Sequence, residues 1–316
     1  MSTKIAFLFP GQGSQAVGMG RDLRERFMVA ARTFEEADEA LGFAISKLCF
    51  EGPEDELRLT ENTQPAILTV SVAAWRVLQA EAVRPELAAG HSLGEWSAHV
   101  AAGTLAFADA VRAVKARGRA MQRAVPAGQG GMAAVLMLDP AKVAEACAEA
   151  VAETGLSVAA ANLNSPGQTV ISGALAAVEK AAEICKAKGA RRAVMLSVSA
   201  PFHCPLMQPA QEEVARVLDG IAMSDPRIPV AANVTGALVR TAAEARDALT
   251  RQVTGAVRWV DCVQALVAAG ANTFIEVGPG KVLTGLMKQI DAAQKALNVE
   301  DGVSLEKTLA EVKANC

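Results

Sequence analysis

Hydrophobic and polar positions along the chain follow two alternating patterns. Short apolar runs with the length of a buried strand occur at residues 4–9, 87–89 and 274–277. Longer amphipathic segments with helical spacing occur between them, for example at residues 63–80 and 107–124. Because strands that alternate with longer helices are typical of α/β proteins, we predict an α/β fold with a mostly parallel main sheet.

The pattern changes after a stretch rich in proline and glycine near residue 128. The segments 132–138, 157–162, 168–172 and 191–197 have strand patterns, and the segments 140–154 and 174–189 have helical patterns. Their order, β-α-β-β-α-β, is that of ferredoxin-like domains. We therefore predict a ferredoxin-like domain at residues 128–197, inserted into a larger α/β-hydrolase-like domain formed by residues 1–127 and 198–316.

Composition excludes several classes of protein. The chain has 316 residues, is 51% hydrophobic and carries a net charge of −3, so it can bury a large core. There is no basic stripe that would indicate nucleic-acid binding, and no apolar run approaches the roughly 20 residues of a membrane helix. No extended apolar surface pattern stands out, and we therefore expect a monomer.

Cysteine and histidine usage indicates the compartment and the absence of a metal. The six cysteines form no C-x-x-C pair, and the segment that begins the sequence lacks the pattern of a signal peptide. We therefore expect free thiols in a reducing cytoplasm. None of the three histidines has metal-ligand spacing with a cysteine pair, and we predict neither a metal nor another cofactor.

One pentapeptide, Gly90-His91-Ser92-Leu93-Gly94, matches the pattern G-x-S-x-G. It follows an apolar run and precedes a helical pattern, so its serine would lie on a sharp turn from strand to helix. The hydroxyl would be exposed there, with the first N–H groups of the helix open towards it. The segment predicts a nucleophilic serine, Ser92, and half of an oxyanion hole.

A nucleophilic serine needs a base. His91 lies within the pentapeptide and His99 lies in the helix that follows it, whereas His203 lies between two prolines in a stiff loop. Only His203 is far enough along the chain to approach Ser92 from a separate loop, and we predict it as the base.

Residues 11–16 follow the first strand and satisfy G-x-G-x-x-[GA], a pattern of dinucleotide-binding loops. Residues 21–41 are helical in pattern, however, where such a unit requires a second strand that ends in an acidic residue. Two other interpretations stay open. The segment is either a tight strand-to-helix turn or a loop that directs the amide N–H of Gln12 at a reacting carbonyl.

Arg117 lies at the edge of the apolar stripe of the helix predicted at residues 107–124, beside Val114 and Met121. An arginine in such a position requires an anion. Pattern alone favours a structural carboxylate over a ligand as that anion.

Together these segments resemble the malonyl-CoA:acyl carrier protein transacylases of type II fatty acid synthesis, nearly from end to end. The segments that carry the resemblance are residues 9–15, 90–95, 117, 162–168, 201–207 and 276–283. The inserted ferredoxin-like domain is also a feature of that family.

The resemblance implies a role for each site residue. Ser92 would attack the thioester, His203 would act as base, and the N–H groups of Gln12 and Leu93 would bind the oxyanion. Arg117 would bind the free malonyl carboxylate through two parallel hydrogen bonds.

The resemblance also implies residues around this centre. The backbone near Gln252 would orient His203, and Phe202, Met121 and Asn162 would contribute to substrate binding, with the ring of Phe202 disfavouring a methyl-branched substrate. The partners would be malonyl-CoA and a phosphopantetheinylated acyl carrier protein. Because such carriers are acidic, we expect a basic docking patch, with Arg191 and Arg192 as candidates.

Three alternatives stay open. A serine thioesterase or hydrolase would also use G-x-S-x-G, but its histidine would be expected after an acidic residue and nearer the C-terminus. A carrier-binding or scaffold protein would keep the fold without the chemistry. A stand-alone malonyl acyltransferase that serves a polyketide synthase would use the same residues with a different carrier.

Overall fold

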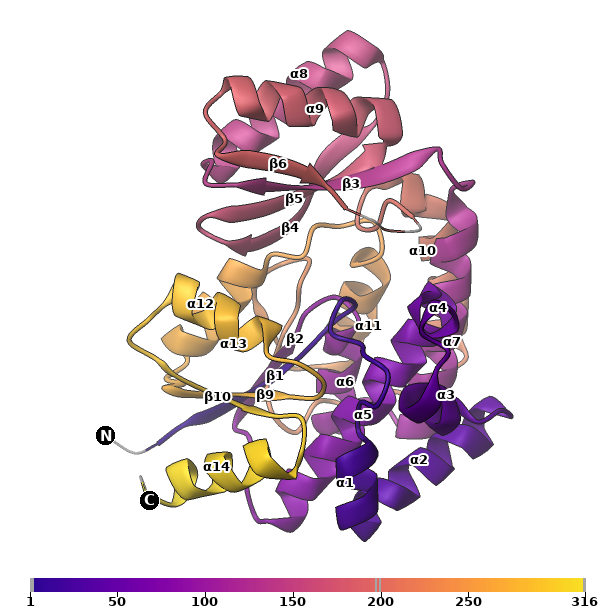
Figure 1. The fold of residues 1–316 in the computed structure, drawn as a ribbon, viewed down its shortest axis with the longest axis vertical. Helices are drawn as coiled ribbons and strands as arrows, with labels where there is room; N and C mark the ends of the chain where they lie inside the picture. Colours follow the sequence, from indigo (N-terminus) through magenta and orange to yellow (C-terminus); the bar gives the residue numbers. More distant parts are fainter. Residues whose placement is uncertain (1–2, 197, 199, 315–316) are drawn as a thin grey trace.

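The computed structural model describes residues 3–196, 198 and 200–314, and these form two sheets with helices packed on them (Figure 1). The larger sheet contains segments from both ends of the chain, and the smaller sheet is formed by a continuous central segment. Ser197, at the predicted end of the last strand of the inserted domain, lies outside the described residues.

The main sheet has the strand order β10-β9-β1-β2-β7-β8. Five strands are parallel, and β8 runs antiparallel to β7. The bounds are β1 (Ile5–Phe9), β2 (Leu87–Gly90), β7 (Val230–Ala231), β8 (Leu238–Val239), β9 (Thr273–Val277) and β10 (Lys295–Val299). The prediction of an α/β protein is confirmed, and β8 makes the main sheet mixed.

Side chains of a strand alternate between the two faces of its sheet. Both faces of this sheet carry apolar side chains, and helices cover both. Ile5, Phe7 and Phe9 of β1 pack against one group of helices, whereas Ala6 and Leu8 pack against the other. The first group includes α1 (Arg21–Arg26), α2 (Met28–Leu41), α3 (Ile45–Glu51), α4 (Glu54–Arg58), α5 (Thr60–Ala80), α6 (Gly94–Ala101), α7 (Phe107–Ala124), α10 (Gln208–Asp219), α11 (Ala242–Arg251) and α14 (Gly302–Lys313). The second includes α12 (Trp259–Ala268) and α13 (Val282–Ile290).

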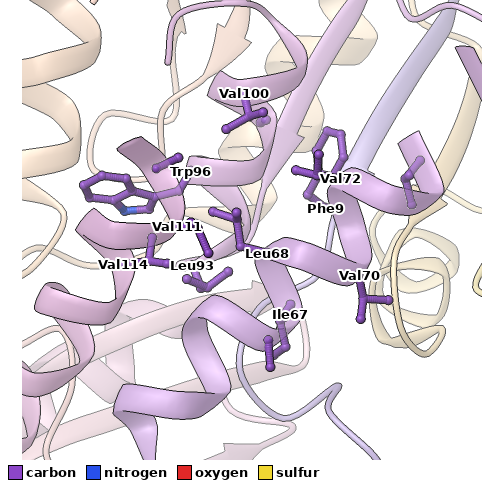
Figure 2. Close-up of a cluster of buried hydrophobic side chains, with 14 of the residues drawn as sticks. Phe9, Ile67, Leu68, Val70, Val72, Leu93, Trp96, Val100, Val111 and Val114 are labelled. Atoms are coloured by element: carbon purple, nitrogen blue, oxygen red, sulfur yellow. The ribbon is translucent and has the colours of Figure 1, made fainter. Parts of the chain in front are cut away.

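Figure 2 shows part of the larger core, where α5, α6 and α7 meet near β1. Trp96 and Leu93 of the segment after β2 lie here with Leu68 of α5 and Val111 and Val114 of α7. The start of α6 is therefore fixed by buried packing on three sides. Among the described residues, no helix combines the length and the apolar character needed to cross a membrane.

Helix α5 begins at Thr60, three positions before the predicted start, so Pro65 lies inside it rather than near its first turn. Proline lacks an N–H group and cannot donate to the carbonyl four residues earlier. Almost the whole central part of α5 is buried, and this packing holds the helix together despite the missing hydrogen bond.

The second sheet has the order β4-β5-β3-β6, with every neighbouring pair antiparallel. Its elements are β3 (Gly130–Leu136), α8 (Pro140–Thr154), β4 (Val158–Ser165), β5 (Gln168–Ala174), α9 (Leu175–Ala187) and β6 (Arg192–Met195). The predicted turn between the two middle strands is present, since Ser165 pairs with Gln168 across it. Helices α8 and α9 enclose a separate hydrophobic core against the sheet.

Strand β4 pairs with the loop that precedes α12, and this contact joins the second sheet to the larger unit. The backbone N–H of Leu163 donates to the Val257 carbonyl (2.9 Å), and the N–H of Val257 donates to the Ala161 carbonyl (2.8 Å). The chain returns from the second sheet through a loop, the short helix η1 (Pro205–Met207) and α10. These connections position β4 and the return loop over the carboxyl end of β2.

Candidate active site

The pentapeptide at residues 90–94 forms the predicted turn between β2 and α6. Ser92 has φ 51°, a backbone conformation that few non-glycine residues adopt. A Cβ atom on Gly90 would lie 1.9 Å from the Gly94 carbonyl carbon, and one on Gly94 would lie 2.0 Å from the Phe9 carbonyl oxygen. Only glycine at both positions lets the turn close tightly enough to present Ser92.

His203 lies directly beside the serine. Its Nε2 is 2.7 Å from Ser92 Oγ, and its Nδ1 is 2.8 Å from the Gln252 carbonyl oxygen. Since a carbonyl only accepts hydrogen bonds, Nδ1 carries the proton and Nε2 has a free lone pair for the serine hydroxyl. Burial and the nearby Arg117 charge lower the pKa of His203 to about 3, so the ring is uncharged at neutral pH and its Nε2 is free to accept a proton.

Arg117 of α7 is buried behind Ser92, with 1% of its surface exposed. Its guanidinium donates to Gln64 Oε1 (2.7 Å), to Gln252 Oε1 (2.9 Å) and to Ser92 Oγ (3.3 Å). Burial lowers the pKa of Arg117 to about 10, against the opposing effect of Glu95.

The structural ion pair that the sequence pattern favoured for Arg117 does not occur among the described residues. Every partner of Arg117 given above is neutral, and no carboxylate of the described part of the chain lies within 4.0 Å of its nitrogens. Burial of a cation that only amides and a hydroxyl contact is costly, so an anion beside Arg117 would be favoured.

The loop after β1 lies against the serine turn. A Cβ atom on Gly11 would lie 2.3 Å from the His91 carbonyl oxygen, so the absence of a side chain permits this approach. The Gln12 side chain donates to Thr60 Oγ1 (3.2 Å), which fixes the loop against α5. Residues 21–41 form α1 and α2, so the second strand that a dinucleotide-binding unit requires is not present there.

Two backbone N–H groups are available beside Ser92. Leu93 stands immediately before α6, where N–H groups have no partner within the helix, and Gln12 lies in the loop after β1. Within the described residues, neither N–H donates to a protein acceptor. Their positions on either side of the turn fit the predicted oxyanion hole.

A cavity of about 430 Å³ lies between the two sheets, and five predicted site residues line it: Gln12, Ser92, Asn162, Phe202 and His203. Asn162 comes from β4 of the second sheet, at an irregularity in its pairing with β5. The site therefore combines the main sheet, the return loop and the second sheet.

The other predicted residues lie beneath this surface. Leu93, Arg117, Met121 and Gln252 are buried and do not line the cavity. The sulfur of Met121 accepts a hydrogen bond from Gln64 Nε2 at 3.7 Å. Met121 thus supports the amide that binds Arg117.

Sequence reasoning missed Asn233, which follows β7 and is completely buried. Its Oδ1 accepts from the Ser92 N–H (2.7 Å), and its Nδ2 donates to the Gly90 carbonyl (2.8 Å). Asn233 therefore holds both sides of the serine turn. A polar residue at the carboxyl end of a parallel strand was the available signal, since sites of α/β proteins gather there.

Other reactive groups are unsuited to the chemistry. Cys204, next to His203, donates to the Pro201 carbonyl, and burial raises the pKa of its thiol. The described cysteines are all buried and free, and Cys316 lies outside the described residues. In the part of the chain that the structure describes, no cluster of three or more His, Cys, Asp or Glu residues could hold a metal ion.

Comparison with known proteins identifies similar sequences and structures. The family model described as acyl transferase domain matches residues 6–313. The malonyl CoA-acyl carrier protein transacylase of Bacillus subtilis strain 168 is 47% identical over 98% of both chains, and that of Salmonella typhimurium is 48% identical over 98% of this chain and 100% of its own.

Solved structures show the same likeness. The acyl-carrier-protein S-malonyltransferase of Burkholderia pseudomallei has a TM-score of 0.94 and 49% identity, covering 98% of this chain and 100% of its own. A malonyl-transacylase in complex with a type II PKS acyl-carrier protein has a TM-score of 0.95 and 46% identity, with the same coverage.

Proposed function

The chain belongs to the acyl transferase domain family, and from this premise we propose that it transfers a malonyl group from malonyl-CoA to the phosphopantetheine thiol of an acyl carrier protein. It is thereby an acyltransferase that supplies extender units for fatty acid synthesis. The observation that carries the proposal is the buried Arg117 cation, which lies behind the nucleophile without an acidic partner among the described residues.

The first half-reaction acylates Ser92. His203 Nε2 takes the hydroxyl proton while Ser92 Oγ attacks the thioester carbon. The C–S bond of the tetrahedral intermediate then breaks, the proton passes from His203 to the departing sulfur, and CoA leaves as its thiol. Malonyl stays bound to the serine as an ester.

The second half-reaction runs the same steps with a new thiol. His203 takes the proton of the phosphopantetheine thiol, the sulfur attacks the malonyl ester, and Ser92 recovers its proton as the C–O bond breaks. The N–H groups of Gln12 and Leu93 bind the oxyanion in both halves, and loss of one such donor typically costs about 10²–10³ in rate.

Arg117 and Phe202 select the acyl group. The free carboxylate of malonyl accepts two charge-assisted hydrogen bonds from the buried guanidinium of Arg117. Phe202 lines the cavity beside His203, where its ring crowds a methyl group on the malonyl C2. Such a steric difference is worth about 1–3 kcal/mol.

The cavity suits the arm that delivers the thioester. Its lining combines polar groups of β4 and β5, among them Asn164 and Gln168, with apolar side chains of Leu196, Leu283 and Leu286. A pantetheine arm has the same mixture of amides and methylene groups, and Asn162 adds a further polar group beside it.

The proposal extends to domain organisation. The strand order β4-β5-β3-β6 with all neighbours antiparallel supports a ferredoxin-like domain, inserted at residues 128–197 into an α/β-hydrolase-like domain of residues 1–127 and 198–316. Arg191 and Arg192 are exposed at the start of β6, which supports their proposed place in a docking patch for an acidic carrier.

The described cysteines are buried free thiols, which supports a location in the reducing cytoplasm. We propose that the protein is a monomer there. Size-exclusion chromatography coupled to light scattering tests the monomer, and a mass of twice that of the chain would contradict it.

Radiolabelled malonyl-CoA tests the function. Label is expected on Ser92 and then on a phosphopantetheinylated carrier, with none retained by Ser92→Ala. Release of free malonate faster than transfer to the carrier would instead indicate a hydrolase. Absence of label on the wild-type serine would favour a scaffold.

A polyketide carrier is the second candidate partner, because one similar structure holds a type II PKS acyl-carrier protein. Transfer rates to the fatty-acid carrier and to a polyketide carrier of the same host, measured side by side, distinguish the two. Faster transfer to the polyketide carrier would overturn the fatty-acid assignment.

A further inference from the structure

Glu95 lies on the first turn of α6, three positions after the nucleophile, and is completely buried. Its Oε2 accepts hydrogen bonds from the Gln252 side chain (Nε2, 2.7 Å) and from the backbone N–H of Asn233 (3.0 Å). A buried carboxylate is costly unless it is well hydrogen-bonded, so its presence here requires an explanation beyond packing.

Both partners of this carboxylate reach the reacting groups. Asn233 Oδ1 accepts from the Ser92 N–H at 2.7 Å. The Gln252 carbonyl oxygen accepts from His203 Nδ1 at 2.8 Å, and Gln252 Oε1 accepts from Arg117 at 2.9 Å. One carboxylate oxygen is thus connected, through Asn233 and Gln252, to Ser92, His203 and Arg117.

The chemistry of the groups also fixes which way the Gln252 amide points. A guanidinium only donates hydrogen bonds, and Glu95 Oε2 already accepts one from the backbone N–H of Asn233. Between Glu95 and Arg117, the amide must therefore present its NH₂ to the carboxylate and its oxygen to the guanidinium. The same NH₂ group donates to the Ser92 carbonyl at 2.9 Å, which adds a second constraint on the serine turn.

We propose that Glu95 is a positioning residue, which orders Ser92, His203 and Arg117 through Asn233 and Gln252 without touching the substrate. This inference rests on the proposed acyl transfer at Ser92. It predicts that the hydrogen-bond acceptor at this position matters more than its charge, because both contacts are N–H groups that a neutral amide oxygen also accepts.

Two substitutions distinguish the role of Glu95 as a hydrogen-bond acceptor from the role of its negative charge. Glu95→Ala removes the acceptor, whereas Glu95→Gln keeps an oxygen in the place of Oε2 and removes the charge. Glu276→Ala is the matched control, because Glu276 is also a buried carboxylate and accepts from the backbone N–H groups of Leu283 and Thr284 in the first turn of α13. Thermal unfolding of each variant reports the structural cost.

Two rates are measured for every variant: single-turnover acylation of Ser92 by malonyl-CoA, and modification of Ser92 by phenylmethylsulfonyl fluoride. The second reagent carries no carboxylate, so its rate reports on Ser92 and His203 without recognition of a substrate carboxylate by Arg117. Small displacements of reacting groups cost up to ~10²-fold in rate, and we expect Glu95→Ala to lower both rates towards that extent. Glu95→Gln recovers most of the loss, and Glu276→Ala lowers the melting temperature with both rates maintained.

The inference is overturned if folded Glu95→Ala reacts at wild-type rates with both reagents, or if Glu95→Gln loses as much as the alanine variant. If the alanine variant fails to fold, Glu95→Asp takes its place. The aspartate side chain is one methylene shorter, so its oxygen lies farther from Gln252 and Asn233. An aspartate variant as fast as the wild type also overturns the inference. If malonyl-CoA leaves no label on the wild-type protein, the proposed function fails, while the sulfonyl fluoride rates still test Glu95.

Discussion

Substitution of Arg117 by alanine is expected to change the preferred acyl group of the enzyme. The guanidinium is buried, lies 3.3 Å from Ser92 Oγ and has only neutral partners among the described residues. A malonyl carboxylate that enters this site gains two charge-assisted hydrogen bonds, whereas an acetyl group gains neither. The variant therefore loses an interaction that only one of the two substrates makes.

The size of the loss follows from the number of hydrogen bonds. A hydrogen bond to a charged group contributes about 1.5–3 kcal/mol, so two contribute about 3–6 kcal/mol. Since about 1.4 kcal/mol corresponds to a factor of ten, kcat/KM for malonyl-CoA should fall by about 10²–10⁴. Arg117→Lys keeps the charge but cannot form the bidentate pair, and its loss should be smaller.

The assay compares kcat/KM for malonyl-CoA and acetyl-CoA with the same carrier. Arg119→Ala is the matched control, because Arg119 lies on the same helix but is exposed and pairs with Glu61 at 2.8 Å. The control should leave both values unchanged. Equal losses for the two substrates in Arg117→Ala would refute the reasoning, since they would mean that Arg117 serves the serine rather than the carboxylate.

Three further predictions concern the turn, the base and the pocket. Gly94→Ala should destabilise the fold by more than about 2 kcal/mol in denaturant unfolding, because the new Cβ meets the Phe9 carbonyl oxygen at 2.0 Å. Gly285→Ala, where nothing lies within 4 Å, should stabilise α13 by up to about 1 kcal/mol, and equal effects of the two substitutions would contradict the packing argument. Because the pKa of His203 is lowered to about 3, sulfonyl fluoride modification of Ser92 should show no inflection near pH 6.5. Below about pH 6.5 the unfolded chain binds a proton at His203 and the folded chain does not, so the contribution of His203 to stability is lost as the pH falls from 6.5 towards 3. An inflection of the modification rate at pH 6.5 would contradict the lowered pKa. Phe202→Ala should improve methylmalonyl-CoA relative to malonyl-CoA by about 10–200-fold in kcat/KM, and an unchanged ratio would remove Phe202 from selectivity.

The local sequence was sufficient to predict the structure at positions where backbone geometry dictates the residue type. The glycines of the pentapeptide are required by contacts of 1.9 and 2.0 Å, so the pattern itself carries the turn. The prolines on either side of His203 likewise indicated a loop. The strands predicted in the central segment are those that form its antiparallel sheet.

Residues whose role arises from contacts between distant segments could not be found in this way. Gln64 lies in an apolar stretch of α5 and looks like an ordinary buried amide, yet it binds Arg117, which is 53 positions away. Asn233 contacts Ser92 across 141 positions. Nothing near either residue in the sequence specifies its partner, because the partner is set by how α5, α7 and β7 pack around the serine turn.

The wide spacing of the site along the chain has a consequence for synthesis on the ribosome. The Gln252 carbonyl that orients His203 lies 160 positions after Ser92, and central strand β1 gains its neighbour β9 only at residues 273–277. A nascent chain that already exposes the nucleophile therefore lacks an oriented base and one side of its central sheet. We therefore expect Ser92 to become reactive only after the segment that carries Gln252 has been synthesised and has packed beside His203.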